Sequence, residues 1–350
     1  MRKVLIRIVF DQSWVTQEAA NEFHLGVGWV ILVWMAVATG SVAVLWQKTR
    51  STKSAAMSLG LWTVVPIVLL LIRAVGIPLA ETGIPIFGYG FMMVVGFLTA
   101  TLLAVNHAKY IGMNPGIIWD LMLWLLIPGL IGARTFYVFQ YSDRVFNGVP
   151  GRNPIVSLLA LSDGGLVFYG SVIGGTVGGW MFCRRRRIRP LLLGDLVAPS
   201  LFVGSGFGRI GCFLYGCCYG GACDLPWAVR FPPDSLTYQV QMQEGVIAPG
   251  ALSTTPLHPT QIYSSLLAFV LAGILVWFFR QRRFEGFVVG MTLTLYPINR
   301  FILEFIRKDE HGQLGTSLTI SQLISIALFI TGITLLVRLS RKRIPLQQSA

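Results

Sequence analysis

The sequence predicts an all-α polytopic membrane protein with about nine transmembrane helices. Three observations predict this class: 54% of the 350 residues are hydrophobic, only 12% are charged, and the apolar residues are gathered in long runs. A soluble domain carries about 25% charged residues, so this chain has too few charges to cover a water-facing surface. The same shortage excludes a disordered chain and disfavours a nucleic-acid-binding protein, despite the net charge of +13.

Nine stretches of the chain are apolar over about the 20 residues that a helix needs to cross a bilayer. In chain order they are 24–47, 56–80, 84–105, 116–139, 164–182, 191–211, 258–279, 285–306 and 316–337. The sixth and eighth stretches fit less well than the others, because each contains ionisable residues.

The basic residues of the loops predict the orientation of these helices. Sixteen of them lie in one set of alternate loops and eight in the other, and the richer set is expected in the cytoplasm. The N-terminus is therefore expected outside and the C-terminus inside. The chain then divides into an outer or interfacial segment at 1–23, two helices at 24–80, a membrane core at 81–338 with an outer head segment at 212–257, and a basic cytoplasmic tail at 339–350.

The clearest polar group inside a span is in YPINRFILEF, at 296–305. Tyr296, Arg300 and Glu304 follow at i, i+4 and i+8 and therefore share one helix face. A charge at the centre of a span costs roughly 2.5–3.5 kcal/mol, so such residues usually have a function. One interpretation is an internal ion pair that satisfies itself. The other is a polar cavity wall, in which Arg300 binds an anion and Glu304 holds it in position.

A second group is GSGFGRIGCF, at 204–213, where Arg209 stands among closely spaced glycines. The pattern G-x-G-x-x-G occurs here, but the dinucleotide-binding interpretation needs a βαβ unit, and this segment is an expected transmembrane helix. The glycines favour a close approach to the backbone beside Arg209. The alternative is that Arg209 only anchors the helix at the membrane interface.

Two further stretches combine packing signals with polar residues. Gly170, Gly174 and Gly178 are spaced four apart, which predicts a close-packed helix face, and Tyr169 is the polar residue beside them. In HPTQIY, at 258–263, His258 opens a span just before a proline suited to the first helical turn. Both a structural and a catalytic role are open for this histidine.

Four of the five cysteines lie within twelve residues on the expected outer side. Cys212, Cys217, Cys218 and Cys223 form the pattern C-x4-C-C-x4-C, which predicts two disulfides with three possible connectivities. A zinc site is the second interpretation, although adjacent cysteines do not form the usual knuckle. A catalytic thiol is the third, and Cys183, at a cytoplasmic helix end, is expected to be inert.

In chain order, the motifs FGYGFMMVVGF, GGLVFYGSVIGG, GDLVAP, GRIGCFLYGCCYG, HPTQIY and YPINRFILEF resemble those of the bacterial prolipoprotein diacylglyceryl transferases. The resemblance runs from about residue 84 to 338. It implies transfer of the diacylglyceryl group of phosphatidylglycerol to the lipobox cysteine thiol of a preprolipoprotein, with release of glycerol 1-phosphate. It also implies a monomer in the bacterial inner membrane, in contact with membrane lipids, with its active site toward the outer leaflet and with no metal, cofactor or nucleic acid.

The resemblance also assigns roles to residues, and it places Arg209 and Arg300 on one lipid phosphate. The expected catalytic residues are Arg209, Arg300, Glu304, Tyr169, Tyr296 and Tyr89. The expected substrate-binding residues are Arg209, Arg300, Arg134, Asp195, Gly220, His258 and Gln261.

The sequence departs from the family pattern at the position of the proposed base. Tyr169 stands where the family often has histidine, and Cys212, Tyr215 and Cys217 replace polar signature residues. The base that activates the substrate thiol is therefore left open between Tyr169, Glu304 and His258. Two alternatives to the transferase are a solute transporter and a family member that has changed or lost its activity.

Overall fold

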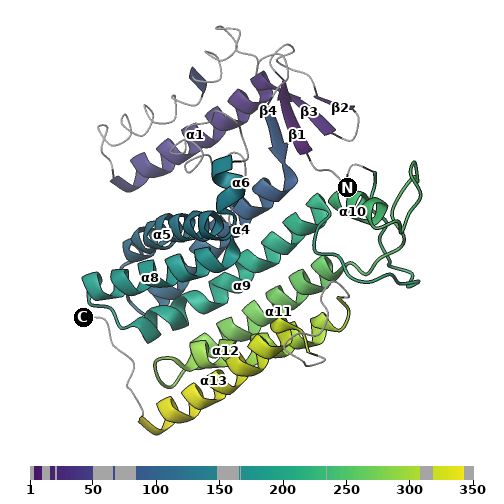
Figure 1. Cartoon of the computed structure of the whole chain (residues 1–350). Coiled ribbons are helices and arrows are strands. Elements are labelled where there is room, and N and C mark those ends of the chain that lie inside the picture. The colour runs from purple at the N-terminus through teal and green to yellow at the C-terminus, as the bar shows by residue number, and fades with distance from the viewer. Residues whose placement is uncertain are drawn as a thin grey trace. The chain divides into compact units, whose positions relative to one another are not determined.

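Helices account for most of the described chain, which confirms the predicted fold class. The computed structural model describes residues 4–9, 16–19, 22–49, 66–67, 84–147, 165, 167–233, 235–307 and 318–342. Figure 1 shows these residues in colour. Within them, five helices are long and apolar enough to cross a membrane, namely α4 (Gly88–Tyr110), α5 (Gly116–Gln140), α9 (Pro190–Tyr215), α11 (Thr260–Gln281) and, over Ile320–Arg341, α13.

Eight of the nine predicted stretches are mostly helical in the described residues. Besides the five helices above, the helices that match predicted stretches are α1 (Val27–Thr49), α8 (Phe168–Arg186) and α12 (Phe287–Glu304). The full bounds of α13 are Ile320–Lys342. The stretch 56–80 lies outside the described residues except for 66–67. Two short helices, α6 (Ser142–Asn147) and α10 (Leu236–Gln243), complete the described helices.

The chain divides into two compact units, the first of which comprises residues 1–94 and 208–262. It contains a small sheet that the sequence pattern did not predict, built from β1 (Val4–Val9), β2 (Thr16–Ala19), β3 (Glu22–Gly26) and β4 (Ile84–Phe87) in the order β2-β3-β1-β4. Strand β1 pairs with β3 in parallel and with β4 antiparallel. Because β4 occupies residues 84–87, α4 begins later than the predicted span.

A small apolar cluster holds the sheet to the helix that follows it. Ile8 of β1 and Val27 at the start of α1 are buried, and Ile86 of β4 packs against them. Strand β1 alternates Ile6, Arg7 and Ile8, so successive side chains point to opposite faces. This alternation explains how a strand that contains an arginine still contributes an apolar face.

The second unit comprises residues 95–207 and 263–350 and contains the main apolar core. Side chains of α4, α5, α9, α11 and α12 form this core, and they include Ile118, Leu196, Leu275, Phe279 and Val288. Many other large apolar side chains of these helices are exposed. Such a surface is unfavourable in water but matches the acyl chains of a bilayer.

Helices α5 and α8 pack backbone against backbone, as the spacing of the glycines predicts. They lie side by side in Figure 1. A Cβ atom at Gly170, Gly174 or Gly178 would clash with the carbonyl oxygen of Gly132, Pro128 or Trp124, respectively. The predicted close-packing face is therefore confirmed, and only glycine fits these positions without moving a helix.

Replacing Gly174 by alanine is expected to destabilise the second unit. The new methyl group would meet the backbone of Pro128, which cannot rotate away, and overpacking of this kind costs about 1–3 kcal/mol. Thermal unfolding of the protein in detergent measures the effect. Gly175→Ala is the matched control, because a Cβ there lies 3.8 Å from the Leu125 oxygen, an ordinary contact. Equal unfolding temperatures for the two variants would contradict the packing.

Candidate active site

Arg209 stands in the last two turns of α9, where α9 packs closely against the start of α4. Gly211 is buried, and a Cβ atom there would lie 3.1 Å from Cδ2 of Tyr89 and 3.4 Å from Cβ of Met92. The glycines beside Arg209 therefore serve the close contact of two helices. Because the segment is one continuous helix, the dinucleotide-binding interpretation does not apply.

Arg209 interacts with the start of α4 as well as with its own helix. Arg209 is half-buried and interacts electrostatically with Tyr89 and Cys212. The ring of Tyr89 lies edge-on to that of Tyr215, with 6.4 Å between the ring centroids. A half-buried guanidinium keeps its charge and offers planar donors that suit a phosphate group.

The loop after α9 is bound to the start of α11. The side-chain amide Nε2 of Gln261 donates to the carbonyl of Cys217 at 2.7 Å, and Oγ1 of Thr260 donates to the carbonyl of Cys218 at 2.8 Å. The backbone N–H of Gly220 donates to the carbonyl of His258 at 3.0 Å. A Cβ at Gly220 would lie 2.6 Å from Cγ2 of Thr260, so a glycine is required at this close approach.

These contacts bring three of the predicted substrate-binding residues together, namely Gly220, His258 and Gln261. Gln261 is fully buried, and its Oε1 atom accepts no hydrogen bond from the described residues. A buried acceptor of this kind costs free energy unless a hydroxyl or a water bonds to it. It is therefore suited to contact a polar ligand.

The structure brings together three of the four cysteines of the C-x4-C-C-x4-C pattern. The Sγ atoms of Cys212, Cys217 and Cys218 all lie within 4.8 Å of one another, and Cys223 is not a member of this group. None of the four is joined in a disulfide among the described residues, and the two predicted disulfides stay a prediction. Hydrogen bonding to Cys212 and Cys218, followed by burial, raises the pKa of the Cys217 thiol, which disfavours Cys217 as a thiolate nucleophile.

In the second unit, Arg300 and Glu304 of α12 form the ion pair that their i, i+4 spacing predicts. The guanidinium NH1 lies 2.8 Å from Oε2 of Glu304. NH2 of Arg300 donates to Oγ of Ser321 at 2.9 Å, and Oγ1 of Thr319 donates to Oε1 of Glu304 at 3.1 Å. Glu304 is only 3% exposed, so its carboxylate holds the guanidinium in one position.

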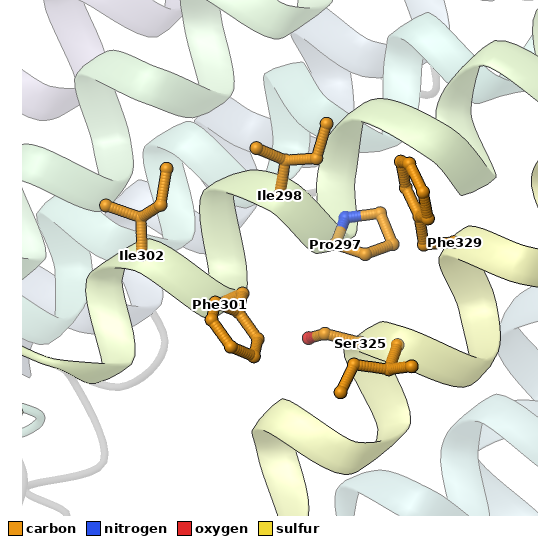
Figure 2. Close-up of a pocket in the computed structure, with 7 residues that line it drawn as sticks. Pro297, Ile298, Phe301, Ile302, Ser325 and Phe329 are labelled. Carbon is orange, nitrogen blue, oxygen red and sulfur yellow. The ribbon is translucent and has the colours of Figure 1, made fainter. Parts of the chain in front are cut away.

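An apolar cavity of about 280 Å³ lies between α12 and α13. On each helix, the residues that line it are near the ion-pair residues and their partners in the sequence. Phe301 follows Arg300 directly, and Ser325 lies one turn after Ser321. Figure 2 shows the side chains that surround the cavity, namely Pro297, Ile298, Phe301 and Ile302 from α12 and Ser325, Ile326 and Phe329 from α13.

Three other predicted site residues of the second unit are Tyr296, Tyr169 and Arg134. Tyr296 of α12 is 40% exposed, and its ring centroid lies 5.6 Å from that of Phe202. Tyr169, near the start of α8, is 60% exposed. NH1 of Arg134 donates to the carbonyl of Gly165 at 3.1 Å, and its guanidinium lies 5.4 Å from the centroid of the Tyr137 ring.

The carboxylate of Asp195 makes hydrogen bonds that stabilise the fold. It is fully buried near the start of α9, and its two carboxylate oxygens accept the backbone N–H groups of Gly286 at 2.7 Å and Val289 at 2.9 Å. It therefore caps the N-terminus of α12, where a negative charge is favourable. Because it precedes Arg209 by about four helical turns on α9, the predicted substrate contact of Asp195 stays a prediction.

The candidate site residues fall into two groups, one in each unit. Tyr89, Arg209, Gly220, His258 and Gln261 belong to the first unit, and Arg134, Tyr169, Asp195, Tyr296, Arg300 and Glu304 belong to the second. Sequence reasoning missed Thr319 and Ser321, which bond to the ion pair, and Thr260, which holds the cysteine loop. Their hydroxyl groups carry no sequence signal that separates them from other serines and threonines.

The long apolar helices define a membrane protein, and within it the guanidinium of Arg300 is paired with the buried carboxylate of Glu304. The family profile of the prolipoprotein diacylglyceryl transferases matches residues 78–338. The chain belongs to this family of membrane transferases, as its motifs predict.

Individual relatives agree with this family. A phosphatidylglycerol–prolipoprotein diacylglyceryl transferase of Clostridium tetani is 36% identical, over 72% of this chain and 92% of the relative. The second such transferase of Clostridium perfringens is also 36% identical, over 72% of this chain and 91% of the relative. A transferase of the same name from Rhodopirellula baltica is 26% identical, and this match covers 93% of the chain and 88% of the relative. That likeness therefore extends beyond residues 78–338.

Proposed function

We propose that this protein transfers the diacylglyceryl group of phosphatidylglycerol to the lipobox cysteine thiol of preprolipoproteins. The observation that carries the proposal is on α12 and α13, where Arg300 is held by Glu304 and Ser321 and where neighbouring residues of the same two helices line an apolar cavity. A phospholipid combines an anionic head group with acyl chains, so it needs both features. The names of the relatives, which state phosphatidylglycerol and prolipoprotein, support the same substrates.

The chemistry explains why cationic side chains are needed. The thiol sulfur attacks the glyceryl carbon that bears the phosphate, a C–S bond forms, and the C–O bond to the phosphate breaks. The leaving group is glycerol 1-phosphate, which gains negative charge as the phosphodiester becomes a monoester, and the thiol proton passes to a base. We assign Arg209 and Arg300 to binding of phosphate oxygens, because charge-assisted hydrogen bonds strengthen as this charge develops.

Glu304 is assigned a positioning role and not that of the base. Its carboxylate is buried and occupied by Arg300 and by the Thr319 hydroxyl. A free thiol has a pKa near 8.5 and needs only mild assistance to ionise. Gln261 is assigned to the glycerol head group, since its buried Oε1 suits a hydroxyl donor.

The test is transfer of label by the purified protein in detergent or lipid vesicles. Phosphatidylglycerol labelled in an acyl chain is incubated with a lipobox peptide, and the products are separated by mass. We expect label on the peptide and release of glycerol 1-phosphate, and neither product with the Cys→Ser peptide. A folded, monodisperse sample that transfers no label to the cysteine peptide would overturn the proposal.

We also propose that the protein lies in the bacterial inner membrane with its N-terminus outside and its C-terminus in the cytoplasm. The basic cluster Arg184, Arg185 and Arg186 at the end of α8 supports this orientation. Single cysteines placed at either terminus of a chain lacking its own thiols would test it. We expect a membrane-impermeant maleimide to label the N-terminal cysteine in intact spheroplasts, and labelling of the C-terminal cysteine instead would contradict the orientation.

Ser325→Phe is expected to raise KM for phosphatidylglycerol several-fold by filling the apolar cavity. Ser325 is 3% exposed and lines the cavity beside Phe329, so a phenyl ring there displaces an acyl chain. Phosphatidylglycerol with shorter chains is expected to recover part of the loss. Ile330→Phe is the control, because Ile330 is 59% exposed on the same helix. An unchanged KM in a folded Ser325→Phe protein would show that no acyl chain uses this cavity.

A further inference from the structure

The three clustered cysteines are brought together by the way α9 ends. Cys212 lies in the last turn of α9, and the backbone N–H groups of Gly216 and Cys217 both donate to its carbonyl, at 2.9 and 3.1 Å. Gly216 and Cys218 have positive φ angles of 78° and 58°. A left-handed residue after a helix turns the chain back on itself, and here it brings Cys217 and Cys218 back to Cys212.

A disulfide bond can join only two of the three clustered sulfurs. Adjacent residues have Cα atoms about 3.8 Å apart, which is below the separation of about 4.4–6.8 Å that most disulfides span, so Cys217 and Cys218 are poor partners for each other. Cys212 can pair with only one of them. One disulfide within the cluster therefore leaves a third thiol beside it, since Cys223 is not part of the group.

A thiophilic metal ion, in contrast, uses all three sulfurs. Zinc binds thiolates at about 2.3 Å, so two sulfurs on one tetrahedral ion lie roughly 3.8 Å apart. The three Sγ atoms, all within 4.8 Å of one another, reach this spacing by small rotations of their side chains. Metal binding releases the protons of the thiols, and the positive charge of the ion offsets the repulsion between the three thiolates.

The surroundings of the cluster fit a bound ion. The carbonyl groups of Cys217 and Cys218 are fixed by Gln261 and Thr260 of α11, so the loop that carries two of the ligands is already held in place. Three thiolates around a divalent ion leave a net charge of −1. Arg209, three residues before Cys212, interacts electrostatically with that residue and offsets this charge.

We propose that Cys212, Cys217 and Cys218 form a binding site for one thiophilic divalent cation of the Zn²⁺ class. Three protein ligands leave the fourth tetrahedral position open to water or to an added ligand. The ion would tie the end of α9 to the loop that contacts α11. No step of the proposed transfer reaction passes through this ion, although Arg209 and Gln261 serve both sites.

The test is the metal content of the full-length protein, purified with a mild phosphine reductant and without chelator, after exposure to Zn²⁺ and gel filtration. We expect about one zinc per chain in the unaltered protein. Cys212→Ser and Cys218→Ser are each expected to lose at least five-fold of the bound zinc. Cys183→Ser and Cys223→Ser are the matched controls, because neither residue belongs to the cluster, and both are expected to keep it.

Cobalt replacement provides a second measurement that does not depend on activity. Co²⁺ bound by thiolates gives an intense sulfur-to-metal charge-transfer band, which is expected in the unaltered protein and in both controls but not in the cluster variants. Absence of bound zinc and of this band in a folded protein with reduced thiols would overturn the proposal, as would zinc retained by Cys212→Ser and Cys218→Ser. The label-transfer assay on the same samples shows separately whether the proposed function holds.

Discussion

Replacing Arg209 by alanine is expected to lower kcat/KM for diacylglyceryl transfer by about 100- to 1,000-fold, which is the usual effect of removing a group that stabilises developing negative charge. Arg209 is half-buried near the end of α9 and interacts electrostatically with Tyr89 of α4, so water cannot fully take over the role of its charge. Arg209→Lys is expected to recover part of the rate, because lysine keeps the charge but not the planar pair of donors. The measurement is the initial rate of label transfer to the lipobox peptide.

Arg230→Ala is the matched control for Arg209→Ala. Arg230 is exposed in the loop after α9, and its NH1 donates to the Thr254 carbonyl at 3.2 Å. Its removal takes away the same charge from the same part of the chain and is expected to change the rate less than two- or three-fold. Equal losses in the two variants would mean that only the general positive charge of this region matters.

Replacing Arg300 by alanine is expected to abolish most of the activity and to destabilise the second unit as well. The change leaves the Glu304 carboxylate, which is 3% exposed, without its 2.8 Å partner. Breaking a buried ion pair by removing one member costs about 3–5 kcal/mol. The loss of stability is measured as a lower unfolding temperature, and the loss of activity as the rate of label transfer.

A paired substitution separates these two effects. Replacing both charges, as in Arg300→Met with Glu304→Leu, removes the unpaired carboxylate and is expected to restore the unfolding temperature, because well-packed apolar residues often replace a buried ion pair without loss of stability. The rate is expected to stay at the level of Arg300→Ala. A doubly substituted protein with nearly normal activity would show that the pair is only structural, which is the alternative that its spacing alone leaves open.

Local pattern predicted the membrane helices well, because length and hydropathy are properties of a single segment. The close-packed glycine face of α8 and the Arg300–Glu304 pair were predicted for the same reason, since both follow from spacing along one helix. The sheet was not predicted, because β1 pairs with β4, which begins at residue 84. No local pattern reports such a pairing.

For the candidate site, too, local sequence spacing predicted some features, whereas others depend on residues far apart in the sequence. The cysteine spacing indicated a cluster, but the positive φ angles of Gly216 and Cys218 decide which three sulfurs meet. Asp195 entered the predicted site through its motif, whereas its carboxylate caps a helix that begins 92 residues later, at Phe287. The partners Thr319 and Ser321 lie beyond the end of α12 and could be found only in three dimensions.

The contact between α5 and α8 has a consequence for motion within the second unit. Carbonyl oxygens and Cα atoms form the contact at Gly132, Gly170 and Gly174, and these atoms have no alternative rotamers. A side-chain interface can slide by switching rotamers, but a backbone interface lacks that freedom. Helices α5 and α8 are therefore expected to move as one rigid body, and any opening that admits a lipid from the bilayer arises at contacts made by side chains.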